Sequence, residues 1–404
     1  MINSPNTPTI RFKGFADVWE QRKFEEAFIE RREKTEQENE DTLLSCAING
    51  MFLNSELFGH FRGTTTIGYL RVKKNDLILS AQNLHLGNAN VNLRFEHGII
   101  SPAYKVYDLN KCNPEFIQAW VKKDDTKNFF LAATTEGASQ CRKNIEWETL
   151  GKQTIPMPSI DEQKQIGAFF KQLDHLITLH QRKLEKLTNI KKSMLEKMFP
   201  QNGSSHPEIR FKGFTDAWEQ RKLGDICSRV QGNDGRMNLP TLTISAANGW
   251  MNQEERFSGN IAGKEQKNYT LLHKGELSYN HGNSKLAKYG TVFSLQTYEE
   301  ALVPRVYHSF RVENGSADFL EYYFATKLPD RELGRLISSG ARMDGLLNIG
   351  YYEFMGIQMM FPTIAEQNQI AGYFRCLDTL ITLHQRELDH LKLLKKGMLQ
   401  QMFV

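Results

Sequence analysis

A long helical pattern that occurs twice constrains the fold of this chain more than any other feature. The first copy runs over residues 159–199 and the second over residues 363–403. With Pro158 aligned to Pro362, the copies agree at 24 of 43 positions. Neither copy has an interior proline, so each is predicted to form one helix of roughly 60 Å at ~1.5 Å per residue. The rest of the fold must be organised around these two helices.

Both copies carry an apolar seam that repeats every seven residues, which is typical of a coiled coil. We expect the copies to pack on each other antiparallel, because that arrangement buries both seams and leaves one compact body at each end. The alternative is that each copy is a long core helix of one globular domain. The predicted seam residues are Ile166, Leu173, His180, Leu187 and Met194 in the first copy, and Ile370, Leu377, His384, Leu391 and Met398 in the second.

The two seam histidines, His180 and His384, interrupt an otherwise apolar stripe. As metal ligands they would need partners that the sequence does not offer. A polar residue at a seam position can instead fix the register of a helix pair. We therefore expect these histidines to set helix register, and we predict no metal site.

A second repeat precedes each body. Ile10–Lys23 returns at Ile209–Lys222 with 12 of 14 residues identical, so the chain is an internal duplication of half its length. The linker Pro200–Glu208 is polar and rich in residues that break helices, and it marks the boundary. We predict four segments, which are a first mixed α/β body with its head at 1–158, a first long helix at 159–200, a second body at 201–362 and a second long helix at 363–404.

The two bodies diverge in sequence but keep the same order of predicted elements. Faint matches survive, such as Lys74–Leu77 against Lys274–Leu277. Each body is expected to be rich in strands, followed by a helix, a glycine-bearing loop and a short strand. The strands are predicted at 69–80, 98–109, 267–280, 289–295 and 301–312, the helices at 114–123 and 317–328, and the glycine-bearing loops at 134–144 and 337–348.

Local chemistry predicts how the long helices begin and how the heads pack. Ser159 with Glu162, and Thr363 with Glu366, have the spacing of a capping box. The aromatic residues of the two heads are expected to pack against the helix pair rather than to stack on bases. The mixed charge run Arg31–Asp41 is expected to be a solvated helix end or loop.

Composition narrows the class of protein. A chain of 404 residues with 40% hydrophobic residues suits two or three domains, and a net charge of +4 permits a nucleic-acid partner without requiring one. The five cysteines are scattered without a CxxC pair, which favours reduced thiols and a cytoplasmic location. No apolar run approaches ~18 residues, so no membrane span is expected.

Known catalytic motifs are missing from the sequence. There is no (D/N)PP(Y/F) motif for amine methylation and no HExxH motif. The stretch at Gly259 is one residue short of a phosphate-binding loop and has Glu265 where serine or threonine is needed. We expect no catalytic role for this chain alone.

The repeated head and the repeated P(S/T)IxEQxxI opening of each long helix resemble the two halves of a Type I restriction–modification specificity subunit. The resemblance covers essentially the whole chain, with the motifs in the expected order, twice. It implies an α+β fold with two mixed α/β target recognition domains, separated by two long antiparallel helices that form a coiled coil with a pseudo-twofold internal repeat.

The resemblance also implies partners and a function. The expected subunit reads a bipartite, asymmetric site in double-stranded DNA. It assembles with two methyltransferase subunits and, for cleavage, with restriction/translocase subunits. It binds no cofactor itself, while S-adenosylmethionine, ATP and magnesium serve the partner subunits. The alternative is a tandem-repeat coiled-coil scaffold with no role in DNA binding.

Candidate DNA-contact residues combine polar chemistry with a loop position. The competing interpretation is that half or more of them are ordinary solvated turn residues. The phosphate candidates are Lys73, Lys74 and Lys274. The remaining candidates are Gln82, Asn83, Ser139, Gln140, Arg142, Lys143 and Asn144 in the first body, and Asn280, Asn283, Ser284, Lys285, Ser339, Arg342 and Asn348 in the second.

Overall fold

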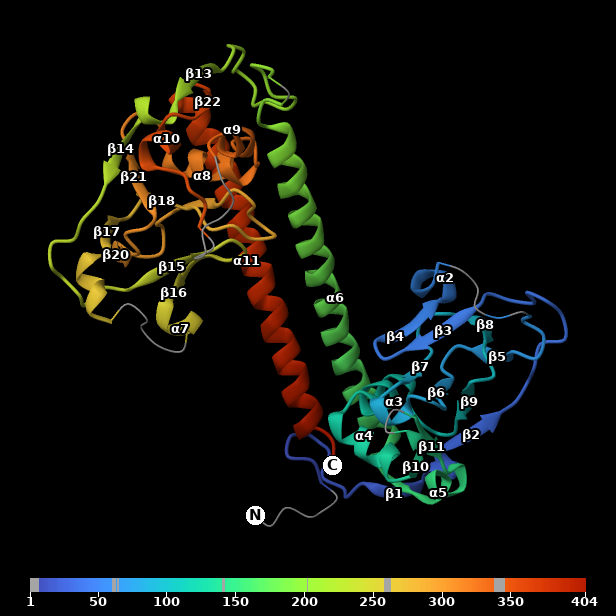
Figure 1. The fold of residues 1–404 in the computed structure, drawn as a ribbon. Helices are drawn as coiled ribbons and strands as arrows, with labels where there is room; N and C mark the ends of the chain where they lie inside the picture. Colours follow the sequence, from blue (N-terminus) through green and yellow to red (C-terminus); the bar gives the residue numbers. More distant parts are fainter. Residues whose placement is uncertain are drawn as a thin grey trace. The chain divides into compact units, whose positions relative to one another are not determined.

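The computed structural model describes residues 7–59, 63, 65–139, 142–201, 203–257, 263–337 and 346–404, with only the backbone at 136–139, 142–144 and 264. The chain divides into two compact units. Unit 1 comprises Met1–Arg182 with His384–Val404, and unit 2 comprises Lys183–Leu383. Figure 1 shows the course of the chain through both units. The four-segment division expected from the repeat stays a prediction.

Unit 1 is built on a four-stranded antiparallel sheet of order β2-β9-β6-β7, with the two-stranded sheets β1-β12, β3-β4, β5-β8 and β10-β11 around it. Its elements are β1 (Glu20–Lys23), α1 (Phe24–Ala27), β2 (Phe28–Arg31), β3 (Leu44–Ala47), β4 (Gly50–Leu53), α2 (Asn54–Leu57), β5 (Leu70–Lys73), β6 (Leu77–Ser80), η1 (Leu84–Leu86), β7 (Ala89–Val91), β8 (His97–Ile100), β9 (Tyr104–Leu109), α3 (Pro114–Val121), α4 (Asp124–Leu131), β10 (Thr134–Ser139), β11 (Arg142–Ile145), α5 (Trp147–Lys152), β12 (Thr154–Met157) and α6 (Ile160–Lys197), which continues into unit 2.

Unit 2 repeats this plan with a four-stranded sheet of order β14-β21-β18-β19 and the two-stranded sheets β13-β22, β15-β16 and β17-β20. Its elements are β13 (Glu219–Lys222), η2 (Leu223–Asp225), β14 (Cys227–Val230), β15 (Leu242–Ser245), β16 (Gly249–Asn252), α7 (Gln253–Phe257), η3 (Gly263–Asn268), β17 (Thr270–His273), β18 (Leu277–Asn280), β19 (Thr291–Ser294), β20 (Glu300–Val303), β21 (His308–Val312), α8 (Ala317–Ala325), α9 (Asp330–Arg335), α10 (Tyr351–Met355), β22 (Gln358–Phe361) and α11 (Ile364–Gln401), which continues into unit 1.

The faint sequence match near residues 75 and 275 is the same turn in both units. Asn75 and Gly275 both have a positive φ, of 72° and 86°, which asparagine and glycine tolerate best. The next residue closes the turn in each case. Asp76 Oδ2 accepts a hydrogen bond from the Lys73 amide at 2.6 Å, and Glu276 Oε2 accepts one from the His273 amide at 2.8 Å. Each of the predicted strands 69–80 and 267–280 is therefore two strands joined by this turn, β5 and β6 in unit 1 and β17 and β18 in unit 2.

The long helices run antiparallel within each unit. In unit 1, Asp174 on α6 lies 2.5 Å from Lys395 on α11, and the Nδ1 atoms of His180 and His384 lie 3.3 Å apart. Residue numbers therefore rise along one helix as they fall along the other. In unit 2, Lys191 lies 2.5 Å from Asp378. The predicted antiparallel pairing is confirmed, and the two histidines meet each other across the pair.

The predicted seam is buried or half-buried at every position. The most buried members are Ile166, Leu173, Leu187, Ile370 and Leu377, each at most 7% exposed. Beside this seam, Leu176 is 42% exposed and Leu380 is 37% exposed. Their neighbours Ile177 and Ile381 are half-buried instead. The seam is thus narrower than the run of apolar residues suggests.

The heads anchor the helix ends, as expected for their aromatic residues. In unit 1 the Trp19 ring packs edge-on against Phe116 and Phe403, with centroids 6.1 and 6.2 Å away. In unit 2 Trp218 packs in the same way against Phe319 and Phe199, at 5.7 and 6.0 Å. The head of unit 1 therefore meets the end of α11, as Figure 1 shows, and the head of unit 2 meets the end of α6.

The predicted capping boxes are only half formed. Ser159 Oγ accepts a hydrogen bond from the Glu162 amide at 3.4 Å, as an N-cap should. The Glu162 carboxylate does not return to the cap, however. It binds the guanidinium of Arg11 through two hydrogen bonds of 2.8 and 2.7 Å, because the head brings Arg11 over the first helical turn.

Unit 2 repeats this arrangement residue for residue. The Glu366 amide donates to Thr363 Oγ1 at 3.4 Å, while its carboxylate takes two hydrogen bonds of 2.7 Å from Arg210. Glu162 is 1% exposed and Glu366 is fully buried. Each glutamate therefore belongs to a buried ion pair that ties the head to the helix, rather than to a capping box.

Two further expectations were wrong in detail. The charge run Arg31–Asp41 is not solvated throughout, because Arg31 ends β2 and is half-buried beside Asp76 and Asp108, and Thr35 is only 3% exposed. The expected glycine-bearing loop at 134–144 is a β-hairpin of β10 and β11. Its counterpart at 337–348 lies largely outside the described residues.

Candidate nucleic-acid interface

Two equivalent loops carry many of the predicted DNA-contact residues. Residues 81–88 join β6 to β7, and residues 281–290 join β18 to β19, so both loops leave the same position of the four-stranded sheet. Gln82 and Asn83 are exposed in the first loop, and Asn283, Ser284 and Lys285 are exposed in the second. The structure thus brings candidates from two divergent sequences to one structural position in each unit.

The first loop is held rigidly at its base. Leu84, the first residue of η1, is fully buried, and the Leu86 amide donates to the Asn83 carbonyl at 3.0 Å. Gly87 ends η1 with a φ of 85°. Asn83 therefore uses its backbone to shape the loop and leaves its side chain at the surface beside Gln82.

The second loop begins with a structural asparagine. Asn280 donates from Nδ2 to the Ile244 carbonyl at 3.2 Å, and its Oδ1 accepts from the Gly282 amide at 3.1 Å. The loop ends at Gly290, where φ is +82° and a Cβ would lie 2.5 Å from the Asn280 carbonyl oxygen. Only glycine fits there. Asn280 shapes this loop, and its contact with DNA stays a prediction.

Sequence reasoning missed an exposed leucine in each of these loops. Leu86 is 50% exposed and Leu286 is 67% exposed. Each lies next to the polar candidates, with a buried neighbour, Leu84 or Ala287, as its anchor. The available signal was an apolar residue inside an otherwise polar turn, which periodicity alone does not reveal.

A buried histidine fixes the segment that carries Asn348. His281 is 7% exposed, and its ring nitrogens lie 2.8 Å from the Leu347 carbonyl oxygen and 2.9 Å from that of Val306. The Leu347 amide also donates to the His281 carbonyl at 2.8 Å. Asn348 is exposed on this fixed segment. Ser339 and Arg342 lie outside the described residues.

The remaining candidates of the first body lie on the hairpin that follows α4. Ser139 ends β10 and pairs with Arg142 at the start of β11, which also contains Lys143 and Asn144. Only the backbone of these residues is described, and Gln140 lies outside the described residues. The contacts of these side chains with DNA stay predictions.

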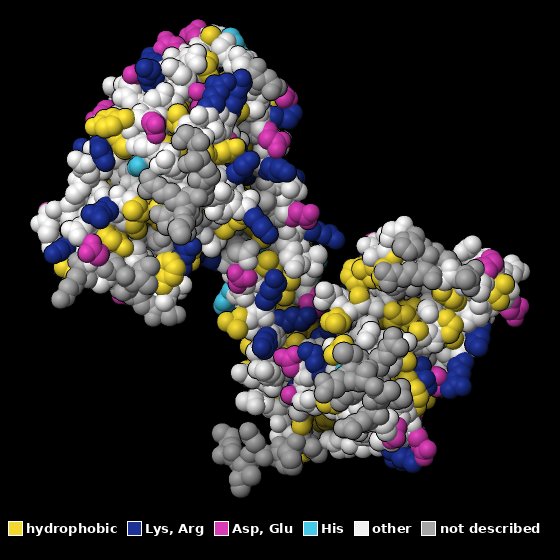
Figure 2. All heavy atoms as spheres, viewed as in Figure 1, with side chains coloured by type: hydrophobic (Ala, Val, Ile, Leu, Met, Phe, Trp, Pro, Cys, Tyr) yellow, Lys and Arg dark blue, Asp and Glu magenta, His cyan; other side chains and the backbone are white. Residues whose placement is uncertain are grey.

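The three predicted phosphate ligands are exposed but paired. Lys73 lies 3.4 Å from Glu33, Lys74 pairs with Glu96, and Lys274 lies 2.6 Å from Glu299. Surface ion pairs of this kind contribute ~0–1 kcal/mol, so a phosphate could replace the glutamate at little cost. On the side drawn in Figure 2, lysine and arginine side chains are spread among acidic residues and do not form one continuous basic stripe.

Other types of site were sought among the described residues. No group of three or more His, Cys, Asp or Glu side chains there could hold a metal ion. None of the helices in the same part of the chain is long and apolar enough to cross a membrane.

Known proteins resemble this chain in sequence. Residues 3–189 match the family described as Type I restriction modification DNA specificity domain. The putative type I restriction enzyme MjaX specificity subunit of Methanocaldococcus jannaschii is 27% identical over 180 residues, which are 43% of this chain and 38% of that protein. The type I restriction enzyme MjaVIII specificity subunit of the same organism is 25% identical over 165 residues, which are 40% and 37% of the two chains. The matched segments thus span less than two fifths of either relative.

A solved structure resembles the chain over nearly its whole length. The crystal structure of a Type-I restriction-modification system S subunit from M. genitalium has a TM-score of 0.60 at 12% identity, and it covers 98% of this chain and 99% of that one. This likeness shows the fold. The family match covers residues 3–189, and the head and the long helix of that matched half recur in the second half of the chain.

Proposed function

We propose that this chain reads a bipartite, asymmetric site in double-stranded DNA, with one half-site assigned to each unit. One observation carries the proposal. The contacts that join head, helix and body are the same in both units, whereas the equivalent loops 81–88 and 281–290 differ in sequence. A repeated frame that presents two different loops suits a protein that must read two different sequences.

The side chains on the two loops match the edges of bases. Glutamine and asparagine can bond adenine in the major groove, and lysine can bond guanine. Leu86 and Leu286 offer the apolar contact that suits the methyl group of thymine. Gln82 and Asn283 are therefore our leading candidates for base contacts, with the leucines beside them, and the paired lysines 73, 74 and 274 are candidates for phosphates.

We further propose that the long helices hold two methyltransferase subunits. Leu176 and Leu179 of α6 are 42% and 45% exposed, and the equivalent Leu380 and Leu383 of α11 are 37% and 51% exposed. The first pair lies in unit 1 and the second in unit 2. In unit 1, a hollow of about 510 Å³ lies beside Leu176 and is lined also by Lys171, Gln172 and His175. Two equal apolar patches suit two copies of one partner.

Chemistry is assigned to the partners in this proposal. The methyltransferase subunits would use S-adenosylmethionine, and restriction/translocase subunits, which use ATP and magnesium, would join for cleavage. The present chain would select the site and would bind none of these cofactors.

Exchange of one body tests the reading of DNA. Residues 24–157 would be replaced by the equivalent body of another family member, and methylated positions would be mapped in DNA from cells that carry the complete system. We expect one half-site to change and the other to stay the same. A change in both half-sites would contradict independent reading, and the absence of any sequence-specific mark with the native chain would favour a scaffold without a DNA role.

Serine substitutions of the leucine pairs test docking. The variant L176S/L179S and the matched variant L380S/L383S should each retain one methyltransferase subunit, and the quadruple variant should retain none. The stoichiometry would be measured by native mass spectrometry. Full occupancy in the quadruple variant would overturn the assignment of the patches.

A further inference from the structure

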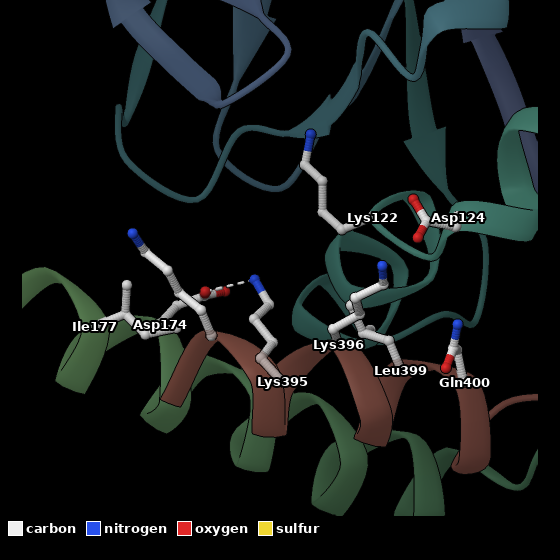
Figure 3. Close-up of a pocket in the computed structure, with 9 residues that line it drawn as sticks. Lys122, Asp124, Asp174, Ile177, Lys395, Lys396, Leu399 and Gln400 are labelled. Carbon is white, nitrogen blue, oxygen red and sulfur yellow. Dashed lines mark hydrogen bonds and ion pairs between the residues drawn. The ribbon is translucent and has the colours of Figure 1, made fainter. Parts of the chain in front are cut away.

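Unit 1 contains a cavity whose lining includes none of the predicted DNA-contact or seam residues. Its volume is about 460 Å³, and it lies where the end of α3 and the start of α4 face α6 and the last turns of α11. Figure 3 shows these side chains gathered between the helices and the body. The lining residues are Lys122, Asp124, Asp174, Ile177, Lys392, Lys395, Lys396, Leu399 and Gln400.

The charges around this cavity are unequal. Four lysines face two aspartates, which gives a formal excess of two positive charges. Lys395 pairs with Asp174 at 2.5 Å, and Asp124 pairs with Lys127 at 3.1 Å. Both carboxylates therefore already have a partner.

The four lysines are not equally available. Lys122 donates to the carbonyl oxygens of Ile48 and Ala89, at 2.7 and 2.8 Å, and burial lowers its pKa to about 8. Lys392 and Lys396 are exposed, and no acidic partner lies within ion-pair distance of either in the described part of the chain. In Figure 3 the ammonium of Lys396 points toward the body.

The equivalent position in unit 2 carries a larger side chain. The N-cap residues Asn113 and Ser316 align α3 with α8, because each amide donates to the equivalent glutamine of the long helix. Ala119 then corresponds to Tyr322. The Tyr322 hydroxyl donates to Asp378 at 2.7 Å, and its ring lies 5.5 Å from the ammonium of Lys191. A tyrosine thus contacts the helix pair in unit 2 at the position where unit 1 has the smaller Ala119.

Unit 2 also has fewer positive charges at the positions equivalent to the lining of this cavity. Lys122 corresponds to Ala325, Lys392 to Thr188, and Gln400 to Glu196, whereas Lys396 is retained as Lys192. The cavity and the excess of lysine therefore occur together in unit 1, whereas two of those lysines have uncharged counterparts in unit 2. This coincidence favours a site for an anion over an accidental gap in packing.

We propose that the lysine cavity of unit 1 binds a backbone phosphate of the DNA that the first body reads. The inference rests on the proposed function. Lysine is a common phosphate ligand, because its flexible stem carries a point charge with three donors. Two lysines without a carboxylate partner can approach one phosphate, and Gln400 can donate a further hydrogen bond.

The cavity is within reach of the same DNA as the candidate hairpin. Helix α4 starts at the cavity and ends three residues before β10. Its eight residues span roughly 12 Å at ~1.5 Å per residue. Successive phosphates of one strand are ~3.4 Å apart along the duplex axis, so this distance corresponds to about four base pairs.

The position of the cavity separates it from the proposed docking patch for the methyltransferase. Asp174 and Ile177 line the cavity, whereas Leu176 and Leu179 form the patch on the same helix. At ~100° per residue, the mean directions of the two pairs differ by roughly 160° around the helix axis. An acidic segment of a methyltransferase on the leucine patch would therefore lie on the far side of α6.

Salt dependence of DNA binding tests the proposal. The full-length chain with its methyltransferase subunits would be titrated with DNA that carries the mapped site, and with unrelated DNA, at several salt concentrations. The double variant K392Q/K396Q should weaken binding to both DNAs alike. It should reduce the slope of log K against log salt by about 0.9, the contribution of one phosphate contact. The matched control is K192Q in unit 2, which should leave the slope unchanged.

A second variant fills the cavity without removing a charge. Ala119→Tyr introduces the residue of unit 2, whose hydroxyl can reach Asp174 as Tyr322 reaches Asp378. The slope should fall by the same amount while the melting temperature is kept. If both variants keep the native slope and the complex still recognises the native bipartite site, the phosphate site in the cavity is wrong. The proposed function would then still stand. Loss of a methyltransferase subunit with an unchanged slope would show an acidic protein segment instead.

Discussion

Ala119 in unit 1 and Tyr322 in unit 2 stand at the same point of two otherwise matching frames. Around both residues the helix pair keeps its ion pair, Asp174 with Lys395 and Asp378 with Lys191. The tyrosine adds a hydrogen bond to Asp378 in unit 2, whereas in unit 1 the equivalent Asp174 lines a cavity with four lysines. The duplication has thus preserved the contacts that hold the frame, while the space between frame and body has diverged.

The two units also differ in which strand supplies the arginine that pairs with a buried carboxylate. The turn carboxylates Asp76 and Glu276 occupy equivalent positions, and each is bound by an arginine. In unit 1 that arginine is Arg31 of β2, whereas in unit 2 it is Arg311 of β21. The partner strand has changed, but the pairing of a buried carboxylate has not. This is expected, because an unpaired buried charge costs far more than the exchange of its partner.

The largest effect is expected from the buried ion pairs that the two units share. Glu162→Ala or Glu366→Ala would leave Arg11 or Arg210 without its partner at a site with little exposure. Each variant should lower the free energy of unfolding by about 3–5 kcal/mol, measured by urea denaturation.

Comparing the losses of unfolding free energy in the two glutamate variants tests whether the contacts between head and long helix are equivalent in the two units. Ser159→Ala is the control for the helix start, since loss of an N-cap costs only about 1 kcal/mol. A loss for one glutamate variant that is as small as this control would show that the two frames are not equivalent.

The next effect concerns the residue that distinguishes the units. Tyr322→Phe removes the hydroxyl that donates to Asp378 but keeps the ring in place. Hydrogen bonds to charged groups contribute about 1.5–3 kcal/mol, so unit 2 should lose stability in that range. Thermal and urea unfolding would measure the loss. A neutral result would show that Lys191 alone satisfies Asp378, as Lys395 satisfies Asp174 in unit 1.

The repeat made much of this architecture predictable. Identical heads and helices predict identical frames, and the seam from Ile166 to Met398 follows from periodicity alone. The roles of Glu162 and Glu366 did not follow, because a local capping rule cannot see an arginine more than 150 residues away. Likewise, the cavity depends on which side chain faces the helix pair from α3, and this is a tertiary property.

The candidate interface was predictable by position more than by residue. Polar turns at 81–88 and 281–290 were identifiable from composition, and they prove to be equivalent loops. The structural hydrogen bonds of Asn280 and the outward position of Leu286 depend on loop geometry, so composition alone revealed neither. His281 was part of a polar turn in the sequence, yet it is buried and fixes the segment of Asn348.

The exposed leucines should affect recognition more than stability. Leu86→Ser and Leu286→Ser change surface side chains, so the free energy of unfolding should change by less than about 0.5 kcal/mol. Each should reduce discrimination at one position of its own half-site by up to about tenfold, which corresponds to ~1.4 kcal/mol. Methylation of a library of mutated sites would measure this. Equal loss at both half-sites from one variant would contradict the assignment of one loop to each half.

The smallest effect is a pH dependence that only unit 2 should show. Burial lowers the pKa of His308 below its ordinary value, with His281 and Arg229 as further causes in the same direction. Its Nε2 lies 2.8 Å from the Ile349 carbonyl oxygen, so the ring also supports the segment of Asn348. The equivalent residue of unit 1 is Lys105, because both pair with the same position of the central strand.

The sign follows from proton binding. Below the unfolded value of about 6.5, the unfolded chain binds a proton at this residue more readily than the folded chain does. The stabilising contribution of neutral His308 is therefore complete above that pH, and it is lost as the pH falls toward the folded pKa. His308→Gln keeps a donor for the Ile349 carbonyl and should flatten the slope of stability against pH below about 6.5. The exposed His206→Gln is the control, and an equal flattening by both variants would remove His308 as the cause.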